Sequence, residues 1–549
     1  MSWKRIVAAL RPLKNPTGST MASESESFFK YTSGKWLHNQ KHKEALRYRK
    51  FNIDALKEEV KRSTGGLAVG MSKWAEGRSN KIFRVQLEDG REVIARIPMP
   101  IAGPPHAVTA SEVATMTFLR TRLGLTQVPR VISWSSQASK TPVGAEFIIM
   151  DVAGGIELAD VWETLEMRQK ATVVQEWVRF EKRVIHAFER GGYGSLYFRQ
   201  DVPSDVARDI FLTGSSQPDS DYVLGPAVPQ QYWEDEYEIP EGISRLHGPW
   251  PDVASYLKSI TSRERCWIEK IAKRPTRKYT APWELPAHLQ IPEDHIHALN
   301  LYDKVAQYLI PSDQRLLRPT MTLLDSNMHN IFLSEEALAR GDIEITGVID
   351  WQQMTILPLY LTAFVPLFIR HLPAKDGQTE EEFLKEKKYL TDVYRALYAD
   401  TGVDYVWASA LAVGVTRPAA QALPFAAQSC WHSGYADLKR RIVRMSFDWQ
   451  KVAPGVECPL ASEGYTEQDL AQVREDDARW YAAEATLEAI EEEVGLRGDG
   501  SVSHDHYDTA VQINQELFDA WKASVDLQEL GDVDPADIWP VGRDSLQRG

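Results

Sequence analysis

The sequence predicts an α+β chain of two lobes, a small β-rich N-terminal lobe followed by a large helical lobe. Strand patterns separated by turn residues fill residues 66–153, whereas helical patterns dominate residues 154–455. The chain has 549 residues, of which 43% are hydrophobic and 26% are charged. That composition is typical of globular proteins and leaves material for more than one domain.

Composition also narrows the range of partners. The formal net charge of -14 argues against a general nucleic-acid binder, because such proteins carry basic surfaces. Cys266, Cys430 and Cys458 lie far apart, which favours neither a disulfide framework nor a zinc site and is typical of a reducing compartment. The most apolar stretch, residues 357–369, is too short to cross a membrane and is interrupted by two prolines, so we expect no membrane span.

The N-terminus has a composition of its own. Residues 1–20 carry four basic residues and a short apolar run, and no acidic residue precedes Glu24. This pattern is typical of a mitochondrial transit peptide, so we expect a transit segment within residues 1–27 and a mitochondrial location. The alternatives are a disordered basic tail, or translation that begins at Met21, and the expected location is then cytoplasmic.

The first lobe is expected to cover residues 28–153, with an aromatic and basic leader packed on it. A helix is expected at residues 54–63, followed by three strands within residues 66–100. The dipeptide Asp89-Gly90 is a strong hairpin signal between the second and third of these strands, because alternating apolar residues flank it.

The third strand and the helix after it carry two charged residues of interest. Arg96 alternates with apolar neighbours and therefore points to the opposite face of its strand. Ser111 is expected near the start of the next helix and Glu112 in its first turn. A further strand is expected at residues 146–152, before the chain passes into the second lobe.

The second lobe is expected to span residues 154–455. Two strands are expected in it, at residues 330–334 and 343–349, and a charged loop joins them into a hairpin. Residues 190–250 hold clusters of proline, glycine and aspartate and are expected to form loops. Residues 456–549 are expected to form a helical C-terminal extension, whose role the sequence does not define.

The segment around the expected hairpin holds a candidate catalytic and metal site. Asp325 lies in a polar loop, Asn330 opens the first strand and Asp350 ends the second. Because a hairpin brings its two ends together, we expect Asn330 and Asp350 to lie close in space, with ligands that suit Mg²⁺. Kinases use the same layout, in which one aspartate accepts the hydroxyl proton and the Asn and the second Asp hold metal on the phosphates. The alternative is a pair of turn carboxylates beside a strand start.

The first lobe is expected to supply a nucleotide clamp. The turn that contains Gly77, Ser79 and Asn80 can cover phosphates, Arg96 can bind them through its guanidinium fork, and Glu112 can pair with Arg96. Each residue also has a simpler interpretation: an ordinary hairpin turn, a solvated strand charge, and a first-turn carboxylate favoured by the helix dipole. The order of the whole set along the chain favours the functional interpretation.

These motifs resemble the aminoglycoside phosphotransferase-type family, and more narrowly its fungal branch named for altered inheritance of mitochondria. The resemblance runs from about Phe28 to Asp505 through FFKYTSGKW, EGRSNKIFRV, GREVIARIP, SEVATMTFLR, GAEFIIMDVAGG, NIFLS and GVIDWQ. It implies a protein-kinase-like two-lobed fold that binds ATP and Mg²⁺ between the lobes, with adenine held by the backbone of Asp151 and Val152.

The same resemblance implies roles for the residues singled out above. It implies Asp325 as the base, Asn330 and Asp350 as metal ligands, and Arg96 with Glu112 at the phosphates. The chain departs from the family pattern at Leu323, where a histidine is common, and at Ser326, Asn327 and His329 in the same loop. Arg96 also stands where active kinases have lysine.

Two hypotheses follow from the motifs and their departures. The first is an enzyme that moves the γ-phosphoryl group of ATP to a hydroxyl of a small molecule. The second is a pseudo-enzyme that keeps the fold as a nucleotide-binding or scaffold protein in mitochondria, and the residues Leu323 and Arg96 favour it. The sequence defines neither the acceptor nor the oligomeric state.

Residues 1–20 are expected to direct import into mitochondria. A chain that begins at Met21 lacks the basic segment and should remain outside mitochondria. Fluorescent fusions of the full chain and of the shortened chain, imaged in the same cells, measure this. Entry of the shortened chain into mitochondria would show that the signal lies elsewhere.

Overall fold

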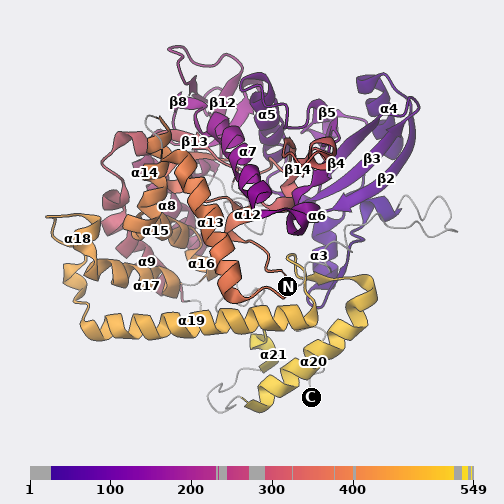
Figure 1. Ribbon diagram of the computed structural model, residues 1–549. Coiled ribbons are helices and arrows are strands. Elements are labelled where there is room, and N and C mark those ends of the chain that lie inside the picture. The colour runs from indigo at the N-terminus through magenta and orange to yellow at the C-terminus, as the bar shows by residue number, and fades with distance from the viewer. Residues whose placement is uncertain are drawn as a thin grey trace.

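The computed structural model describes residues 26–229, 233, 244–270, 291–323, 325–375, 377–399, 403–433, 435–524, 535–541 and 546. Figure 1 shows a strand-rich lobe beside a larger helical lobe, and a long helix that runs along the base of the molecule. The α+β, two-lobed architecture predicted from the sequence is confirmed. The expected transit segment, apart from its last two residues, lies outside the described residues.

One five-stranded antiparallel sheet forms the first lobe, in the order β2-β3-β4-β6-β5. The four strands expected from the sequence are present, and the Asp89-Gly90 turn joins the second and third of them. Gly90 has φ 84°, which glycine adopts without a steric penalty. The strands are β2 (Ala68–Glu76), β3 (Asn80–Leu87), β4 (Glu92–Pro98), β5 (Val131–Ser135) and β6 (Phe147–Asp151).

The leader is ordered and packs on this sheet, as expected. Phe29 and Phe51 are buried against Phe83 of β3. The leader contains β1 (Lys35–Trp36) and α3 (Gln40–Arg47), and α4 (Ile53–Thr64) follows it where a helix was predicted. β1 pairs in antiparallel fashion with β17 (Ser501–Val502), so the leader also contacts the far end of the chain.

Helix α5 (Ala107–Thr121) follows β4 and is buried along most of its length. Glu112 lies in its second turn, so the expectation that it occupies the first turn is wrong. The helix begins earlier because His106, with φ 67°, redirects the chain just before Ala107, and residues 107–110 are helix-compatible. The helix dipole therefore does not account for Glu112, since its effect is confined to the first turn.

The second lobe is a set of helices around one continuous hydrophobic core. Its largest fully buried side chains include Trp162, Trp177, Trp351 and Trp407. The helices are α6 (Leu158–Val161), α7 (Met167–Ile185), α8 (Val253–Lys270), α9 (Pro292–Val305), α11 (Leu359–Thr362), α12 (Leu367–Arg370), α13 (Glu380–Tyr398), α14 (Val403–Thr416), α15 (Pro418–Gln428), α16 (Cys430–Ser433), α17 (Tyr435–Phe447) and α18 (Trp449–Val452).

The prediction of loops over residues 190–250 is wrong in part, and so is the prediction of only two strands in this lobe. Short strands form small sheets in the second lobe, several of them within or next to residues 190–250. Glycines at positive φ flank some of these strands, including Gly191 and Gly194. Strands of two to four residues are too short to show a period of two, which is why the pattern did not reveal them. They are β7 (Ile156–Glu157), β8 (Phe188–Arg190), β9 (Ser195–Phe198), β10 (Arg208–Asp209), β11 (Phe211–Leu212), β12 (Tyr222–Gly225), β13 (Pro319–Met321) and β16 (Ile356–Pro358).

The hairpin predicted in the second lobe is present. β14 (Ile331–Leu333) pairs in antiparallel fashion with β15 (Ile345–Val348), and the charged connection contains a short helix, α10 (Glu335–Ala339). β7 pairs with the other edge of β14. The hairpin is therefore joined to the segment that links the two lobes.

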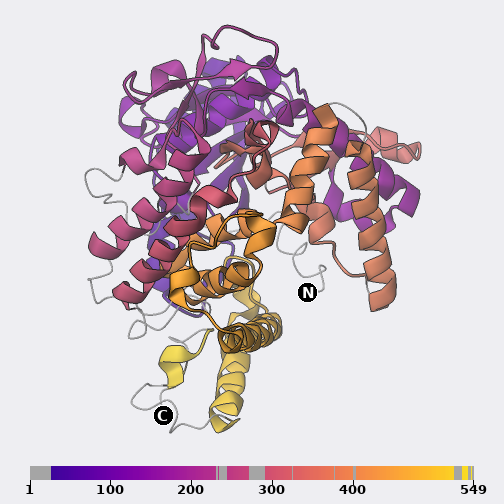
Figure 2. The ribbon, with the colours of Figure 1, turned by 90° about the vertical axis from the view of Figure 1, so that its left-hand side faces the viewer.

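The C-terminal extension lies as a separate layer below the second lobe in Figure 2, which looks along its main helix. That helix, α19 (Glu467–Val494), begins at a capping box of Thr466 and Asp469 and ends at Gly495. Arg440 of α17 pairs with Asp477 of α19 at 3.3 Å. After β17 come α20 (Tyr507–Ser524) and α21 (Pro535–Ile538). None of the helices in the described part of the chain has the length and apolar character needed to span a membrane.

The core of the second lobe encloses an ionisable side chain, Glu181 of α7. Tyr394 and Tyr398 of α13 each donate a hydrogen bond to Glu181 Oε2 at 2.7 Å. Burial raises the pKa of Glu181 to about 7, although the tyrosine hydrogen bonds oppose that shift. The folded state therefore holds this proton more tightly than the unfolded state does.

Glu181→Gln is expected to make the stability of the protein depend less on pH. In the wild type, stability should fall by up to roughly 3 kcal/mol as pH rises from about 4.5, the unfolded value, to about 7. Melting temperatures of both proteins between pH 5 and pH 8 measure this, and the advantage of the variant should grow with pH. A constant difference across that range would mean that Glu181 does not titrate there.

Candidate functional site

The catalytic loop predicted from the sequence lies at the open end of the β14–β15 hairpin. Asn330 donates from Nδ2 to the backbone oxygen of Asp325 at 3.0 Å, and the amide of Ile349 donates to the backbone oxygen of Asn330 at 3.0 Å. Asp350 follows Ile349 directly. The structure thus brings Asp325, Asn330 and Asp350 together.

The unusual residues of this loop hold it in place. Asn327 donates from Nδ2 to Asp325 Oδ1 at 2.7 Å and accepts from the amide of His329 at 2.9 Å. Ser326 accepts from the amide of Leu367 at 3.0 Å through its hydroxyl oxygen. Leu323 is buried in the core of the second lobe. Polar contacts and apolar packing therefore order the loop where the family pattern has other residues.

Asp350 sits in an unusual backbone conformation. Its φ is 64°, a left-handed conformation that is rare for a residue other than glycine and that costs roughly 1 kcal/mol or more. Its side chain is 43% exposed, so it faces an opening. Although the side chain is partly exposed, desolvation by the protein packed around the carboxyl raises its pKa, Arg96 lowers it in part, and the charge of Asp325 raises it further. The two carboxylates therefore repel each other.

Arg96 and Glu112 form the ion pair expected between β4 and α5. Arg96 Nη1 donates to Glu112 Oε1, and both side chains are buried. The alternative of a solvated strand charge does not fit this environment. Burial raises the pKa of Glu112 to about 7, while the Arg96 charge opposes that shift and Asp350 adds to it. Arg96 Nη2 lies 3.8 Å from Asp350 Oδ1, so the guanidinium reaches across to the second lobe.

Gln352 is the site residue that sequence reasoning missed. Its Oε1 accepts from Arg96 Nη2 and from Asn80 Nδ2, each at 2.8 Å. Asn80 is the first residue of β3. The single Gln352 oxygen therefore connects Asn80 and Arg96, both in the first lobe, to the second lobe. The signal was present in the motif GVIDWQ, where Gln352 follows Asp350 by two positions, but the spacing alone gave it no role.

The turn between β2 and β3 rests on a buried cluster of charges. Glu76, 1% exposed at its side chain, pairs with Lys73 at 3.0 Å and with Lys81. It also accepts from the amide of Thr32 in the leader at 2.7 Å. Above the turn there is room, because a Cβ added at Gly77 would meet no heavy atom within 4 Å.

The remaining residues of the predicted clamp lie just before β3 and at the end of β6. Ser79 is buried, and its backbone oxygen accepts from the amide of Met99 at 2.9 Å. The amide of Asp151 donates to the backbone oxygen of Arg130 at 3.0 Å, so that N–H is not available to a purine base. Val152 lies just beyond β6 and is partly exposed.

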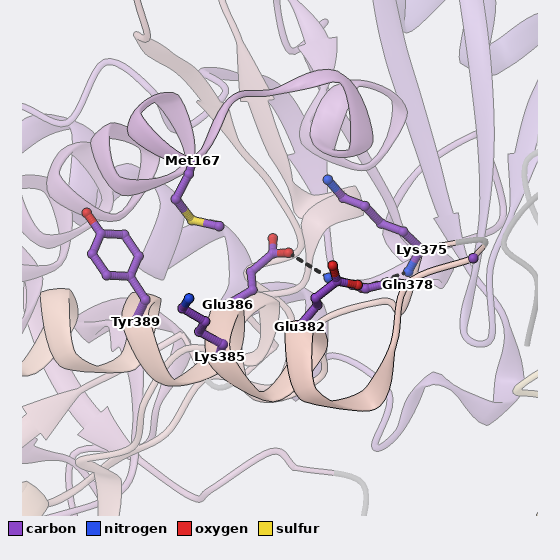
Figure 3. Close-up of a pocket in the computed structure, with 8 residues that line it drawn as sticks. Met167, Lys375, Gln378, Glu382, Lys385, Glu386 and Tyr389 are labelled. Atoms are coloured by element: carbon purple, nitrogen blue, oxygen red, sulfur yellow. Dashed lines mark hydrogen bonds between the residues drawn. The ribbon is translucent and has the colours of Figure 1, made fainter.

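A cavity of about 610 Å³ lies elsewhere, between the N-terminal ends of α7 and α13. Figure 3 shows its lining side chains, among them Met167 and Tyr389, with the hydrogen bond from Gln378 to Glu386 drawn as a dashed line. Glu386 also pairs with the buried Lys170. The lining contains no residue of the catalytic loop, so this cavity is separate from the candidate site.

Relatives of this chain include proteins of Aspergillus fumigatus and of the yeasts Yarrowia lipolytica and Candida tropicalis. A subtelomeric hrmA-associated cluster protein of Aspergillus fumigatus is 28% identical over 491 residues, which cover 81% of this chain and 92% of the relative. The altered inheritance of mitochondria protein 9 of Yarrowia lipolytica is 26% identical over 65% of this chain and 63% of its own length. The protein of the same name from Candida tropicalis is 24% identical over 74% of this chain and 70% of its own length.

Solved structures and a family model complete the comparison. The streptomycin–ATP complex of APH(2″)-IIa matches with 11% identity and a TM-score of 0.34, over 70% of this chain and 98% of that chain. The ADP-bound aminoglycoside phosphotransferase APH(2″)-Ib matches with 12% identity and a TM-score of 0.32, over 77% of this chain and 96% of that chain. The family model for the phosphotransferase enzyme family, APH, matches residues 71–361, from β2 through the hairpin to α11. Because that match spans more than half of the sequence, the chain belongs to the APH phosphotransferase family.

Proposed function

We propose that this chain transfers the γ-phosphoryl group of ATP to a hydroxyl of a small molecule. The observation that carries the proposal is the convergence of Asp325, Asn330 and Asp350 at one hairpin end, opposite the buried Arg96–Glu112 pair. All of these residues lie within the segment that the family model matches.

The donor set at the hairpin end fits Mg²⁺. Asp350 and Asp325 repel each other, and a divalent cation beside them would relieve that repulsion. Asn330 uses its Nδ2 on a backbone oxygen, which leaves its amide oxygen for a cation. Asn330 and Asp350 would hold Mg²⁺, and when bound the ion would join the ATP phosphates to the protein and offset their charge.

Asp325 is placed to act on the acceptor. Its Oδ1 is held by Asn327, so the second carboxylate oxygen is left to accept the proton of the attacking hydroxyl. The side chain is exposed, as access by an acceptor requires. Loss of that proton makes the hydroxyl oxygen a better nucleophile towards phosphorus, and positioning and electrostatics supply most of the remaining rate.

The first lobe would hold the rest of the nucleotide. Arg96 Nη2 and Asn80 Nδ2 are donors at the cleft and suit phosphate oxygens, while Gly77 and Ser79 shape the turn above them. Val152 would offer its backbone to adenine. We also propose a mitochondrial location, which the names of the yeast relatives and the composition of residues 1–20 support.

Arg96→Ala is expected to weaken Mg·ATP binding about tenfold or more, because a charge-assisted contact to phosphate is lost. It will also lower stability, since Glu112 is left buried without its partner. Arg96→Lys is the matched control, because it keeps the charge and should retain both properties in part. Calorimetric titration below the melting temperature of each variant separates the two effects. Unchanged affinity with a lower melting temperature would make Arg96 a structural residue only.

Asp325→Asn and Asp350→Ala should have different effects. Asp325→Asn should keep Mg·ATP affinity and lower turnover about 10²- to 10⁴-fold, because it removes the proton acceptor. Asp350→Ala should lose Mg²⁺-dependent ATP binding, because it removes the carboxylate and leaves only the amide of Asn330, which is a weaker Mg²⁺ ligand. Titrations, together with ATP consumption across a library of hydroxyl-bearing metabolites, measure both.

The same pair of variants tests the alternative of a pseudo-enzyme that binds nucleotide without turnover. In that case Asp325→Asn would change neither binding nor ATP consumption, while Asp350→Ala would still lose nucleotide. If neither variant affected ATP binding, the nucleotide site would lie elsewhere in the chain.

A further inference from the structure

Gln352 accepts hydrogen bonds from the same two donors that the proposed function assigns to the ATP phosphates. Its Oε1 takes one hydrogen bond from Arg96 Nη2 and one from Asn80 Nδ2, both at 2.8 Å. Two donors from separate strands of the first lobe therefore converge on one oxygen of the second lobe. A phosphate oxygen bound by the same donors would have to lie near the same position.

The contact leaves two buried polar atoms unsatisfied. Within the described part of the chain, Gln352 Nε2 and Asn80 Oδ1 have no hydrogen-bond partner. Flipping the Gln352 amide would not give these atoms partners, because its NH₂ group would then face the guanidinium of Arg96, which is also a hydrogen-bond donor. A buried polar group without a partner is costly, so this arrangement is a poor one for the two amides.

The backbone around Gln352 is strained as well. Asp350 and Gln353, on either side of it, have φ of 64° and 62°. Gln353 makes a second contact between the lobes, through Nε2 to the backbone oxygen of Ala102 at 3.3 Å. Strain of this kind is typical of segments that change conformation or bind ligands.

We propose that Gln352 is an internal competitor for the phosphate donors, which holds the lobes together without nucleotide and is displaced when phosphate binds. This inference rests on the proposed function, because it assumes that Arg96 and Asn80 serve the nucleotide. A carbonyl oxygen is a neutral acceptor and a phosphate oxygen is a charged one, so the charged acceptor wins the two donors. The strain and the unsatisfied amide atoms make the release of Gln352 easier.

The competition predicts effects of opposite sign for two substitutions at one position. Gln352→Ala removes the competitor and should tighten Mg·ADP binding about three- to tenfold, since two hydrogen bonds no longer have to be broken. Gln352→Glu supplies a charged acceptor that holds Arg96 more strongly and repels phosphate, and should weaken binding. Gln353→Ala is the matched control. It removes a contact between the lobes that involves neither Arg96 nor Asn80, and should leave affinity close to that of the wild type.

Calorimetric titration of the full-length chain with Mg·ADP measures these affinities, and hydrogen exchange without nucleotide gives a second readout. Amides of the β2–β3 turn should exchange faster in Gln352→Ala than in the wild type, because the turn is no longer tied to the second lobe. Weaker or unchanged binding by Gln352→Ala, with wild-type binding intact, would overturn the competition and leave the proposed function standing. Unchanged exchange at the turn would also overturn it. Absence of nucleotide binding in the wild type and in every variant would overturn the proposed function and this inference together.

Discussion

The arrangement of the candidate site depends on the contacts of the buried Arg96 guanidinium. It pairs with Glu112 on one side, and on the other it reaches Gln352 and the carboxylate of Asp350. Burying charges is expensive unless their partners are well placed, so the positions of α5 and of the segment after β15 are coupled to this one side chain. A shift of either element would leave a charge without its partner. The geometry of the candidate site follows from this constraint, because Asp350 is one of the groups that it fixes.

Local patterns predicted the parts of the fold that repeat over several residues. Four of the five strands of the first lobe, the Asp89-Gly90 hairpin and the β14–β15 hairpin followed from alternation and turn residues, whereas β5 was not predicted. The pairing of Arg96 with Glu112 also followed, because a strand and the helix after it lie side by side. The small sheets between β8 and β12 did not follow, since their strands are too short to carry a period. The start of α5 was placed near Ser111, but the helix begins earlier, because the chain turns at His106 just before Ala107.

Contacts that depend on distant segments were beyond the reach of sequence patterns. The role of Gln352 depends on Asn80, 272 positions away in the sequence, and on Arg96, 256 positions away. Neither residue type suggests the other. The pairing of β1 with β17 is equally non-local and has no signature in either strand. For the site, the sequence therefore predicted that Asp325, Asn330 and Asp350 lie together, but not the contact that joins the lobes. The roles of these residues stay predictions until nucleotide binding is measured.

The link between β1 and β17 has a consequence for the order in which the molecule is assembled. The leader is synthesised long before its pairing partner, because Trp36 of β1 lies 463 positions before Asp499, whose backbone oxygen accepts a hydrogen bond from the Trp36 indole. Tyr31 likewise donates to Asp499, and Thr32 of the same leader caps the buried Glu76 beneath the β2–β3 turn. The first lobe can therefore begin to fold early, but the contacts of its leader with β17 and Asp499 form only once that distant segment has been synthesised. Until then the leader, which also binds Glu76 through the amide of Thr32, lacks one of the two surfaces that hold it, so the support beneath the β2–β3 turn is completed by a segment that is made much later.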